Sequence, residues 1–238
     1  MPGGVDEAGK GPALGPMVAA AVWAPSRDRL PDGVADSKDL SPERRESIAA
    51  RLRADEAIAI GVARITPARI DAPETDMNGL AVEAHAGAIE DALAGSGSRD
   101  DGPRGASSHD DDMPRGVCDA CDTDADRFAR RVQTACATDV TIDARHGADA
   151  EDSLVAAASV VAKVDRDAQV AAIATEYRDR GYPDVGSGYP SDPSTRTFLE
   201  TYVEDNGTLP DCARRSWKTC RDVLARVEQR GLADYASE

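Results

Sequence analysis

Lysine is scarce in this 238-residue chain. Only four of its 28 basic residues are lysine, against 44 acidic residues, and the formal net charge is −16. This pattern is typical of proteins from a cytosol of very high salt, where screening shortens the repulsion among surface carboxylates to a few ångströms. We therefore interpret the composition as halophilic and haloarchaeal. The four surviving lysines, at positions 10, 38, 163 and 218, become candidates for specific contacts.

Long apolar runs and targeting signals are also missing. No apolar run reaches 18 residues, so no membrane span is expected. The N-terminus lacks a basic segment followed by an apolar one, so we predict no secretory signal and a cytoplasmic location. Nothing in the sequence signals an oligomer, and we expect a monomer.

Cysteine and histidine are too few to suggest a metal-binding scaffold. Five cysteines without a signal peptide do not predict a disulfide framework. Cys118 and Cys121 form a lone CxxC pair, and none of the three histidines has the spacing that would complete a zinc site.

The order of predicted elements indicates an α/β sheet domain followed by a helical C-terminal extension. Strands are predicted at 3–6, 17–24, 57–65, 115–119 and 138–143, from apolar runs bounded by turn residues. Helices are predicted at 42–54, 80–93, 124–136, 153–178, from 192 onward and at 217–230. Residues 95–116 are Gly, Ser, Asp and Pro with almost nothing to bury, which predicts a disordered insertion; a functional clamp is the alternative.

The N-terminal stretch GGVDEAGKGP combines two unusual features. Asp6 and Glu7 are adjacent carboxylates, whose repulsion is unfavourable unless something neutralises them. Gly9 and Gly11 flank Lys10, and glycines carry an entropic cost unless the backbone approaches something closely. The stretch therefore predicts a metal cation next to a phosphate.

Further acidic residues offer more candidates. Asp119 ends an apolar strand, where a carboxylate without a partner is costly. The DxDxD run at 122–126 resembles the start of a calcium-binding loop. However, Arg127 stands where that loop requires Gly, and Gln133 stands where it requires the bidentate Glu. We therefore predict that the run forms a helix N-terminus instead. Farther along, spacing alone does not choose among Asp143, Asp149, Asp152, Asp165 and Asp167.

Tyr189 lies in the tight turn GSGYPSDPST. Its ring is poorly placed for a core, so it could stack on a sugar or base, or pack over its own turn.

Five segments together resemble the ribonuclease HII family of the archaeal type. They are DEAGKGP at 6–12 with Gly15-Pro16 after it, Asp36-Ser37-Lys38 with Leu40, AAASVVAKVDRD at 156–167, GSGYPSDPST at 186–195, and RRSWKT at 214–219. All four lysines lie inside these segments. The resemblance covers nearly the whole chain except the insertion and the last few residues, and the five motifs in order are highly specific. One departure is Lys10, where the family more often has arginine.

The resemblance implies a ribonuclease H-like fold, a central mixed β-sheet flanked by helices, with a helical extension. It implies a catalytic domain at 1–180 and a substrate-binding extension at 181–238. It also implies four catalytic, metal-binding carboxylates. Two match Asp6 and Glu7, the strand-end pattern matches Asp119, and the ADA pattern before the AAS helix selects Asp149 over Asp143 and Asp152.

The implied activity is hydrolysis of the RNA strand of RNA–DNA hybrids, and cutting 5′ to ribonucleotides embedded in duplex DNA. Two Mg²⁺ or Mn²⁺ ions would activate water and stabilise the leaving 3′ oxygen, giving 3′-OH and 5′-phosphate ends. The implied substrate contacts are the backbone of Gly9, Lys10 and Gly11 on the 2′-hydroxyl and Tyr189 on the adjacent deoxyribose. Lys38, Lys163 and Arg166 are candidate phosphate contacts, and Ser37 is a further substrate-binding residue.

Several alternatives stay open. Arg166 and Asp167 could form only a surface pair, and Ser37 could only cap a turn. Trp217 is predicted to be a core residue, with stacking on nucleic acid as the alternative, and Lys218 beside it could contact the hybrid backbone. Another nuclease of the same fold is the alternative enzyme. A hybrid-binding protein that does not cut is the alternative of another class, but it would require a missing carboxylate. An acidic calcium-buffer protein fits the composition but no ligand spacing.

Overall fold

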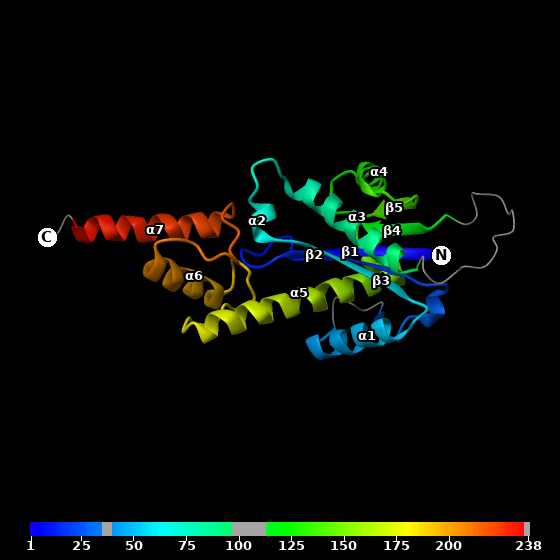
Figure 1. The fold of residues 1–238 in the computed structure, drawn as a ribbon, viewed down its shortest axis with the longest axis horizontal. Helices are drawn as coiled ribbons and strands as arrows, with labels where there is room; N and C mark the ends of the chain where they lie inside the picture. The colour runs from blue at the N-terminus through cyan, green and yellow to red at the C-terminus, as the bar shows by residue number, and fades with distance from the viewer. Residues whose placement is uncertain (35–39, 97–112, 236–238) are drawn as a thin grey trace. The chain divides into compact units, whose positions relative to one another are not determined.

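A computed structural model describes residues 1–34, 40–96 and 113–235 of the chain (Figure 1). Ser37, Lys38 and most of the predicted insertion at 95–116 lie outside the described residues. The chain forms two compact units, which we describe separately. The first unit comprises Met1–Ala8, Val18–Arg64 and Met77–Asp165, and the second comprises Gly9–Met17, Ile65–Asp76 and Arg166–Glu238. The predicted division assigns catalysis to residues 1–180 and substrate binding to residues 181–238. The compact units do not test these roles, so the division stays a prediction.

A five-stranded mixed sheet forms the centre of the first unit, in the order β3-β2-β1-β4-β5. The strands are β1 (Pro2–Ala8), β2 (Met17–Trp23), β3 (Ala59–Ile65), β4 (Arg115–Asp119) and β5 (Thr141–Arg145). Strand β1 pairs antiparallel with β2 and parallel with β4, and β4 pairs parallel with β5. Parallel neighbours end at the same edge of a sheet, so Ala8, Asp119 and Arg145 mark one edge.

Helices cover both faces of this sheet (Figure 1). On one face lie α1 (Pro42–Ala54) and the first half of α5 (Ser153–Asp179), which share a core with β2. On the other face, α3 (Met77–Ser96) contacts β1, and α4 (Ala125–Ala135) contacts α3 and β5. The mixed sheet and its helices confirm the predicted α/β class.

Small residues allow α5 to approach β1 closely. Its first half reads LVAAASVVA, and Leu154, Ala156 and Ala158 are fully buried. A Cβ atom at Gly4 of β1 would lie 2.2 Å from the backbone carbon of Leu154, so no side chain fits there. The backbone contact fixes how far α5 lies from the strand that carries Asp6.

Short elements complete the first unit. Ser41 caps α1 by accepting a hydrogen bond from the Arg44 amide, as the Ser-Pro pair predicted. Two 3-10 turns, η1 (Arg27–Arg29) and η3 (Ala148–Ala150), were not predicted. Strand β5 begins at Thr141 rather than at 138, because its pairing with β4 starts where Thr141 faces Arg115.

The second unit is helical and has its own core. It contains α2 (Pro67–Ile70), the second half of α5, α6 (Pro193–Asn206) and α7 (Lys218–Tyr235). Tyr177 packs edge-on against Phe198 and Tyr202 in this core, with ring centroids 4.9 and 5.7 Å away. Within the described ranges, no helix is long and apolar enough to cross a membrane.

Candidate active site

Strand β1 delivers Asp6 and Glu7 at its carboxyl end. Adjacent side chains on a strand point to opposite faces, and these two do so. The buried Asp6 lies beside the Ser159 hydroxyl of α5, whereas Glu7 reaches His85 of α3, with 2.8 Å between Oε2 and Nε2. The Glu7 amide also donates to Asp6 Oδ1 at 2.8 Å. The two carboxylates therefore face opposite helical layers, Asp6 toward α5 and Glu7 toward α3.

Burial and repulsion both act on Asp6. Burial, together with the charge of Glu7, raises the pKa of Asp6 to about 7. The charge of Asp119 contributes to the rise, while the Ser159 hydroxyl and His85 oppose it. The Asp6 carboxylate is therefore costly to ionise unless a cation compensates it.

Asp119 ends β4, at the sheet edge where β1 also ends. Its Oδ1 accepts a hydrogen bond from the Ala148 amide at 3.0 Å. Partial burial raises its pKa, and the charges of Asp149 and Glu7 act in the same direction, although the Ala148 amide lowers it. Asp119 is thus electrostatically coupled to carboxylates from two other segments.

Asp149 lies in η3, directly after the amide that binds Asp119. The turn follows Gly147, whose φ of +69° is favoured by glycine and lets the chain leave β5 abruptly. Asp149 is buried. The first unit therefore brings Asp6, Glu7, Asp119 and Asp149 into one electrostatically connected group, which we call the carboxylate cluster.

The competing aspartates lie in other surroundings. Asp143 is exposed on β5 and accepts two hydrogen bonds from Arg145, at 3.0 and 2.8 Å. Asp152 accepts from Arg27 at 2.6 Å and from the Leu154 amide at the start of α5. Both carboxylates have structural partners that explain their presence.

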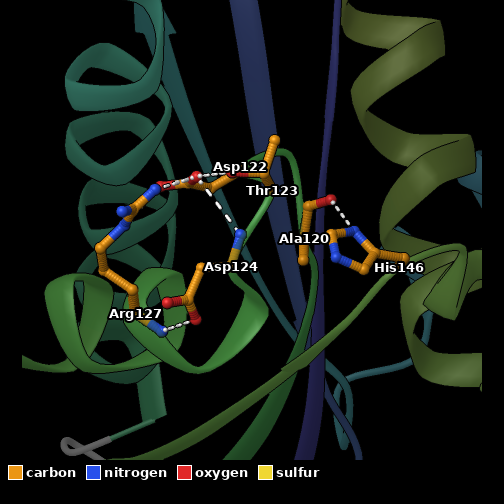
Figure 2. Close-up of polar contacts among 6 residues, drawn as sticks. All are labelled: Ala120, Asp122, Thr123, Asp124, Arg127 and His146. Carbon is orange, nitrogen blue, oxygen red and sulfur yellow. Dashed lines mark hydrogen bonds and ion pairs between the residues drawn. The ribbon is translucent and has the colours of Figure 1, made fainter.

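The DxDxD segment forms the start of α4, as predicted (Figure 2). Asp124 caps the helix by accepting from the Arg127 amide at 2.9 Å. The buried Asp122 accepts two hydrogen bonds from the Arg127 guanidinium, which lowers the pKa of Asp122 to about 2. In the same view, His146 Nδ1 lies 3.2 Å from the Ala120 carbonyl oxygen. These contacts hold the turn that follows Asp119.

The fit of a metal to the carboxylate cluster follows from its chemistry. Four carboxylates supply hard oxygen ligands of the kind that Mg²⁺ and Mn²⁺ prefer. Their burial and mutual repulsion are relieved by a divalent cation. Among the described residues, no three His, Cys, Asp or Glu side chains converge closely enough to hold a metal ion as they stand. The cluster fits the ion chemically, and its side chains would have to turn toward a shared point to bind it.

The second unit holds the glycine loop, which we define as residues 9–11. Gly9 has a φ of +85°, and a Cβ there would lie 2.9 Å from the Pro16 carbonyl oxygen, so glycine is required. Gly11 is exposed, and a Cβ there would lie 3.8 Å from Tyr189. The predicted loop and the predicted tyrosine are therefore neighbours in this unit.

Arg166 organises the turn that carries Tyr189. Arg166 is buried, its Nη2 donates to the Ser187 carbonyl at 2.8 Å, and its guanidinium lies 5.1 Å from the Tyr189 ring centroid. Its Nη1 is 3.6 Å from Asp167, so the surface pair exists but is a minor contact. The Tyr189 side chain is 41% exposed, which makes its ring available for stacking.

The remaining predicted residues are less constrained. Lys163 is half-buried on α5 in the first unit. Trp217 is also half-buried and packs against the core of the second unit, while its Nε1 donates to the Gly11 carbonyl at 2.9 Å. Lys218 is exposed and pairs with Asp222 within α7.

Two residues with direct contacts to the predicted site were missed. His85 bonds Glu7, and Arg214 bonds three carbonyls in and after the glycine loop. Their partners lie 78 and about 200 positions away. No local pattern reveals such a pairing, although Arg214 lies in the RRSWKT motif.

The fold is found in solved structures of known proteins. The ribonuclease H2 of Pyrococcus horikoshii OT3 matches with a TM-score of 0.78 and 34% identity, covering 95% of this chain and 98% of that one. A structure of the PCNA:RNase HII complex from Archaeoglobus fulgidus matches with a TM-score of 0.75 and 32% identity, covering 94% and 96%. The sheet, its helices and these matches define a protein of the ribonuclease H-like class.

Sequence comparison gives the family within that class. The family model for Ribonuclease HII matches residues 3–220. A protein of Haloarcula marismortui named Ribonuclease HII is 55% identical over 232 residues, covering 98% of this chain and 99% of the relative. The chain belongs to the ribonuclease HII family. It is a type 2 ribonuclease H, an endoribonuclease that acts on RNA–DNA hybrids.

Proposed function

We propose that this enzyme also cuts duplex DNA on the 5′ side of an embedded ribonucleotide, leaving 3′-OH and 5′-phosphate ends, by hydrolysis that depends on two divalent cations. The observation that carries the proposal is the coupling of Asp6, Glu7, Asp119 and Asp149 within one unit. Such a concentration of buried negative charge lowers stability, and a catalytic metal site gives a reason for it.

The carboxylate cluster would hold the cations. Bound there, Mg²⁺ or Mn²⁺ would supply Lewis acidity at the scissile phosphate. Glu7 is oriented by His85 of α3, and one oxygen of Asp6 by the Glu7 amide. Asp119 Oδ1 is fixed by the Ala148 amide. These contacts restrict where the carboxylate oxygens can point and so limit the geometry of any ion they share.

The glycine loop would recognise the ribonucleotide. Its backbone amides would donate to the 2′-hydroxyl, the group that distinguishes RNA from DNA. Tyr189 would pack on the adjacent deoxyribose with the Arg166 guanidinium behind its ring. Lys163 and Arg166, with Lys38 outside the described residues, are proposed phosphate contacts, and Ser37, also outside them, is a further proposed substrate-binding residue.

A cleavage assay with matched variants tests the proposal. The substrate is a DNA duplex that carries one ribonucleotide, in high salt with Mn²⁺ or Mg²⁺. Asp119→Asn removes a member of the carboxylate cluster and should reduce cleavage about 100-fold or more. Asp143→Asn changes an exposed carboxylate bonded to Arg145 and should leave cleavage unchanged. Mapping of the product ends checks the position of the cut.

Two other outcomes would change the proposal. If Asp143→Asn abolishes cleavage and Asp119→Asn does not, the assignment of the third carboxylate is wrong although the reaction stands. If the wild-type enzyme cuts hybrids but never the single-ribonucleotide duplex, it is a nuclease of the same fold with a narrower substrate. No cleavage of either substrate across metals and salts would favour a protein that binds hybrids without cutting.

The remaining proposals concern the setting of the enzyme. The net charge of −16 with four lysines supports adaptation to a high-salt cytoplasm. We also propose that the enzyme acts as a monomer, with catalysis in 1–180 and substrate binding supported by 181–238.

A further inference from the structure

Arg214 is a buried cation that serves three carbonyl oxygens. Its Nη2 donates to Gly9 O at 2.6 Å, its Nη1 to Lys10 O at 3.0 Å and its Nε to Gly15 O at 3.0 Å. The side chain has no exposed surface. Burial lowers the pKa of Arg214 to about 10, so the guanidinium remains charged at neutral pH. A buried charge persists only where its hydrogen bonds are well satisfied, and here the backbone of one loop satisfies them.

Trp217 continues the same set of contacts. Its Nε1 donates to Gly11 O at 2.9 Å, and the Arg214 guanidinium lies 5.0 Å from its ring centroid. Two side chains therefore hold three consecutive carbonyls, those of residues 9, 10 and 11. We call Arg214 and Trp217, with these hydrogen bonds, the loop brace.

The segment between the two side chains is itself anchored. The Trp217 amide donates to the Arg214 carbonyl at 3.0 Å, which closes a turn. Asp71 accepts from the Arg215 amide at 2.7 Å and from the Ser216 amide at 2.9 Å. The Ser216 hydroxyl adds a third hydrogen bond at 2.6 Å. The loop brace is therefore built on a fixed turn of the second unit.

Holding the carbonyls also sets the direction of the amides. In a planar trans peptide, the C=O of one residue and the N–H of the next point in opposite directions. The described residues contain no cis peptide. With the carbonyls of Gly9 and Lys10 bound to Arg214, the amides of Lys10 and Gly11 point away from it. Pro12 follows Gly11 and has no N–H, so these two amides are the ones that Arg214 orients, while Trp217 fixes the Gly11 carbonyl at the end of the loop.

We propose that Arg214 and Trp217 are positioning residues for ribonucleotide recognition: Arg214 holds the amides of Lys10 and Gly11 in the direction needed to bind a 2′-hydroxyl, and Trp217 supports it by fixing the Gly11 carbonyl and packing on the Arg214 guanidinium. This inference rests on the proposed function, in which the glycine loop reads that hydroxyl. The brace acts through the backbone and does not itself touch substrate. It therefore sets how well the enzyme distinguishes ribose from deoxyribose, more than how tightly it holds a duplex.

The test is a comparison of two duplexes of the same sequence, one with a single ribonucleotide and one of DNA only. Their Kd values are measured with chelator present, in the salt that best stabilises the enzyme. Trp217→Phe keeps an aromatic ring but loses the donor to Gly11. It should lower affinity for the ribonucleotide duplex about fivefold and leave affinity for the all-DNA duplex unchanged. Arg214→Lys keeps the charge but has one donating nitrogen instead of three. It should lower affinity for the ribonucleotide duplex about tenfold or more and leave affinity for the all-DNA duplex unchanged.

Matched controls remove comparable interactions elsewhere in the second unit. Tyr182→Phe removes a hydroxyl that accepts from Asn206 at 2.7 Å, and Arg226→Lys alters an exposed pair with Glu200. Both should keep the wild-type ratio of the two Kd values. Thermal unfolding of each variant checks folding; if Arg214→Lys does not fold, Trp217→Phe decides the question.

The outcomes separate the brace from the proposed function. If the wild type discriminates and the variants keep its full ratio, or lose affinity for both duplexes equally, the brace has only a structural role and the inference is overturned. If the wild type binds both duplexes alike, the loop does not read the 2′-hydroxyl, and the proposed recognition falls together with the brace.

Discussion

The Nε2 atom of His85 lies 2.8 Å from Oε2 of Glu7, although 78 positions separate the two residues. The imidazole is fully buried and packs edge-on against Phe128, with ring centroids 5.1 Å apart. Because an ionised carboxylate only accepts hydrogen bonds, we assign the proton to Nε2. The other ring nitrogen, Nδ1, is buried and has no hydrogen-bond partner among the described residues. The hydrogen bond from Nε2 thus fixes one oxygen of Glu7.

The first prediction concerns this contact. His85→Phe keeps a buried ring without the donor and should raise the Mn²⁺ concentration for half-maximal binding about 10-fold. His85→Gln retains an N–H donor and should recover most of the affinity. Calorimetric titration of Mn²⁺ into the enzyme without substrate gives the readout. Ile89→Val, another buried position on α3, is the packing control. Equal Mn²⁺ affinity in His85→Phe and wild type would show that the hydrogen bond does not orient a metal ligand.

A second prediction concerns the stability that the fold loses by burying the carboxylate cluster without a metal. Asp6 is buried beside like charges, so Asp6→Asn should raise the Tm by a few degrees in chelator while abolishing cleavage. Added Mn²⁺ should raise the Tm of the wild type more than that of the variant, because the variant has lost a ligand. Asp143→Asn, on the surface, should behave as wild type in both measurements. A lower Tm for Asp6→Asn than for wild type in chelator would contradict the inference that the buried Asp6 carboxyl, beside like charges, destabilises the fold.

The third prediction uses the pair formed by Asp122 and Arg127. The pKa of Asp122 is lowered to about 2, so its ionised form stabilises the fold above the ordinary pKa of an aspartate. That contribution is lost as the pH falls through about 2. Asp122→Asn should therefore be less stable than wild type at pH 7, and the difference should shrink as the pH falls from 4 toward 2. Denaturant unfolding across this range measures it.

A surface pair provides the comparison for that experiment. Asp222 contacts Lys218 in an exposed i,i+4 arrangement. Exposed pairs of this kind contribute little, so Asp222→Asn should change stability only slightly at any pH. A constant difference between Asp122→Asn and wild type down to pH 2 would contradict the role given to the ionised carboxylate.

The fourth prediction concerns salt. Phosphate contacts weaken as salt rises, but a chain with a net charge of −16 needs screening to remain folded. Cleavage should therefore pass through a maximum as KCl is raised, and Tm should rise over the same range. A steady loss of activity from low salt upward would contradict the halophilic interpretation.

Much of the fold could be predicted because its signals are local. Ser41 and Pro42 start α1 at the predicted residue, and β4 has the predicted bounds. The Gly-Tyr-Pro turn also predicted that the ring of Tyr189 is poorly placed for a core, and the residue is exposed. The start of β5 could not be predicted, since it depends on pairing with β4 rather than on its own residues.

In the site too, residues that belong to local motifs could be predicted, whereas residues whose partners lie far away in the sequence could not. The resemblance to known motifs selected the four carboxylates, and the structure brings them into one coupled group. His85 and Arg214 escaped prediction because each acts on a partner far away in the sequence. A lone histidine on a helix is most often a core residue, and nothing in the neighbouring sequence marks this one.

Gly4 lies where β1 and α5 leave no space for a side chain. Because its missing side chain lets β1 touch the backbone of α5, even one methyl group at position 4 would force the strand and helix apart. Ser159 and Asp6 sit on those two elements, so their spacing would widen with them. The spacing within the carboxylate cluster thus depends on a residue that has no side chain, and position 4 should tolerate little mutation although it takes no part in the chemistry.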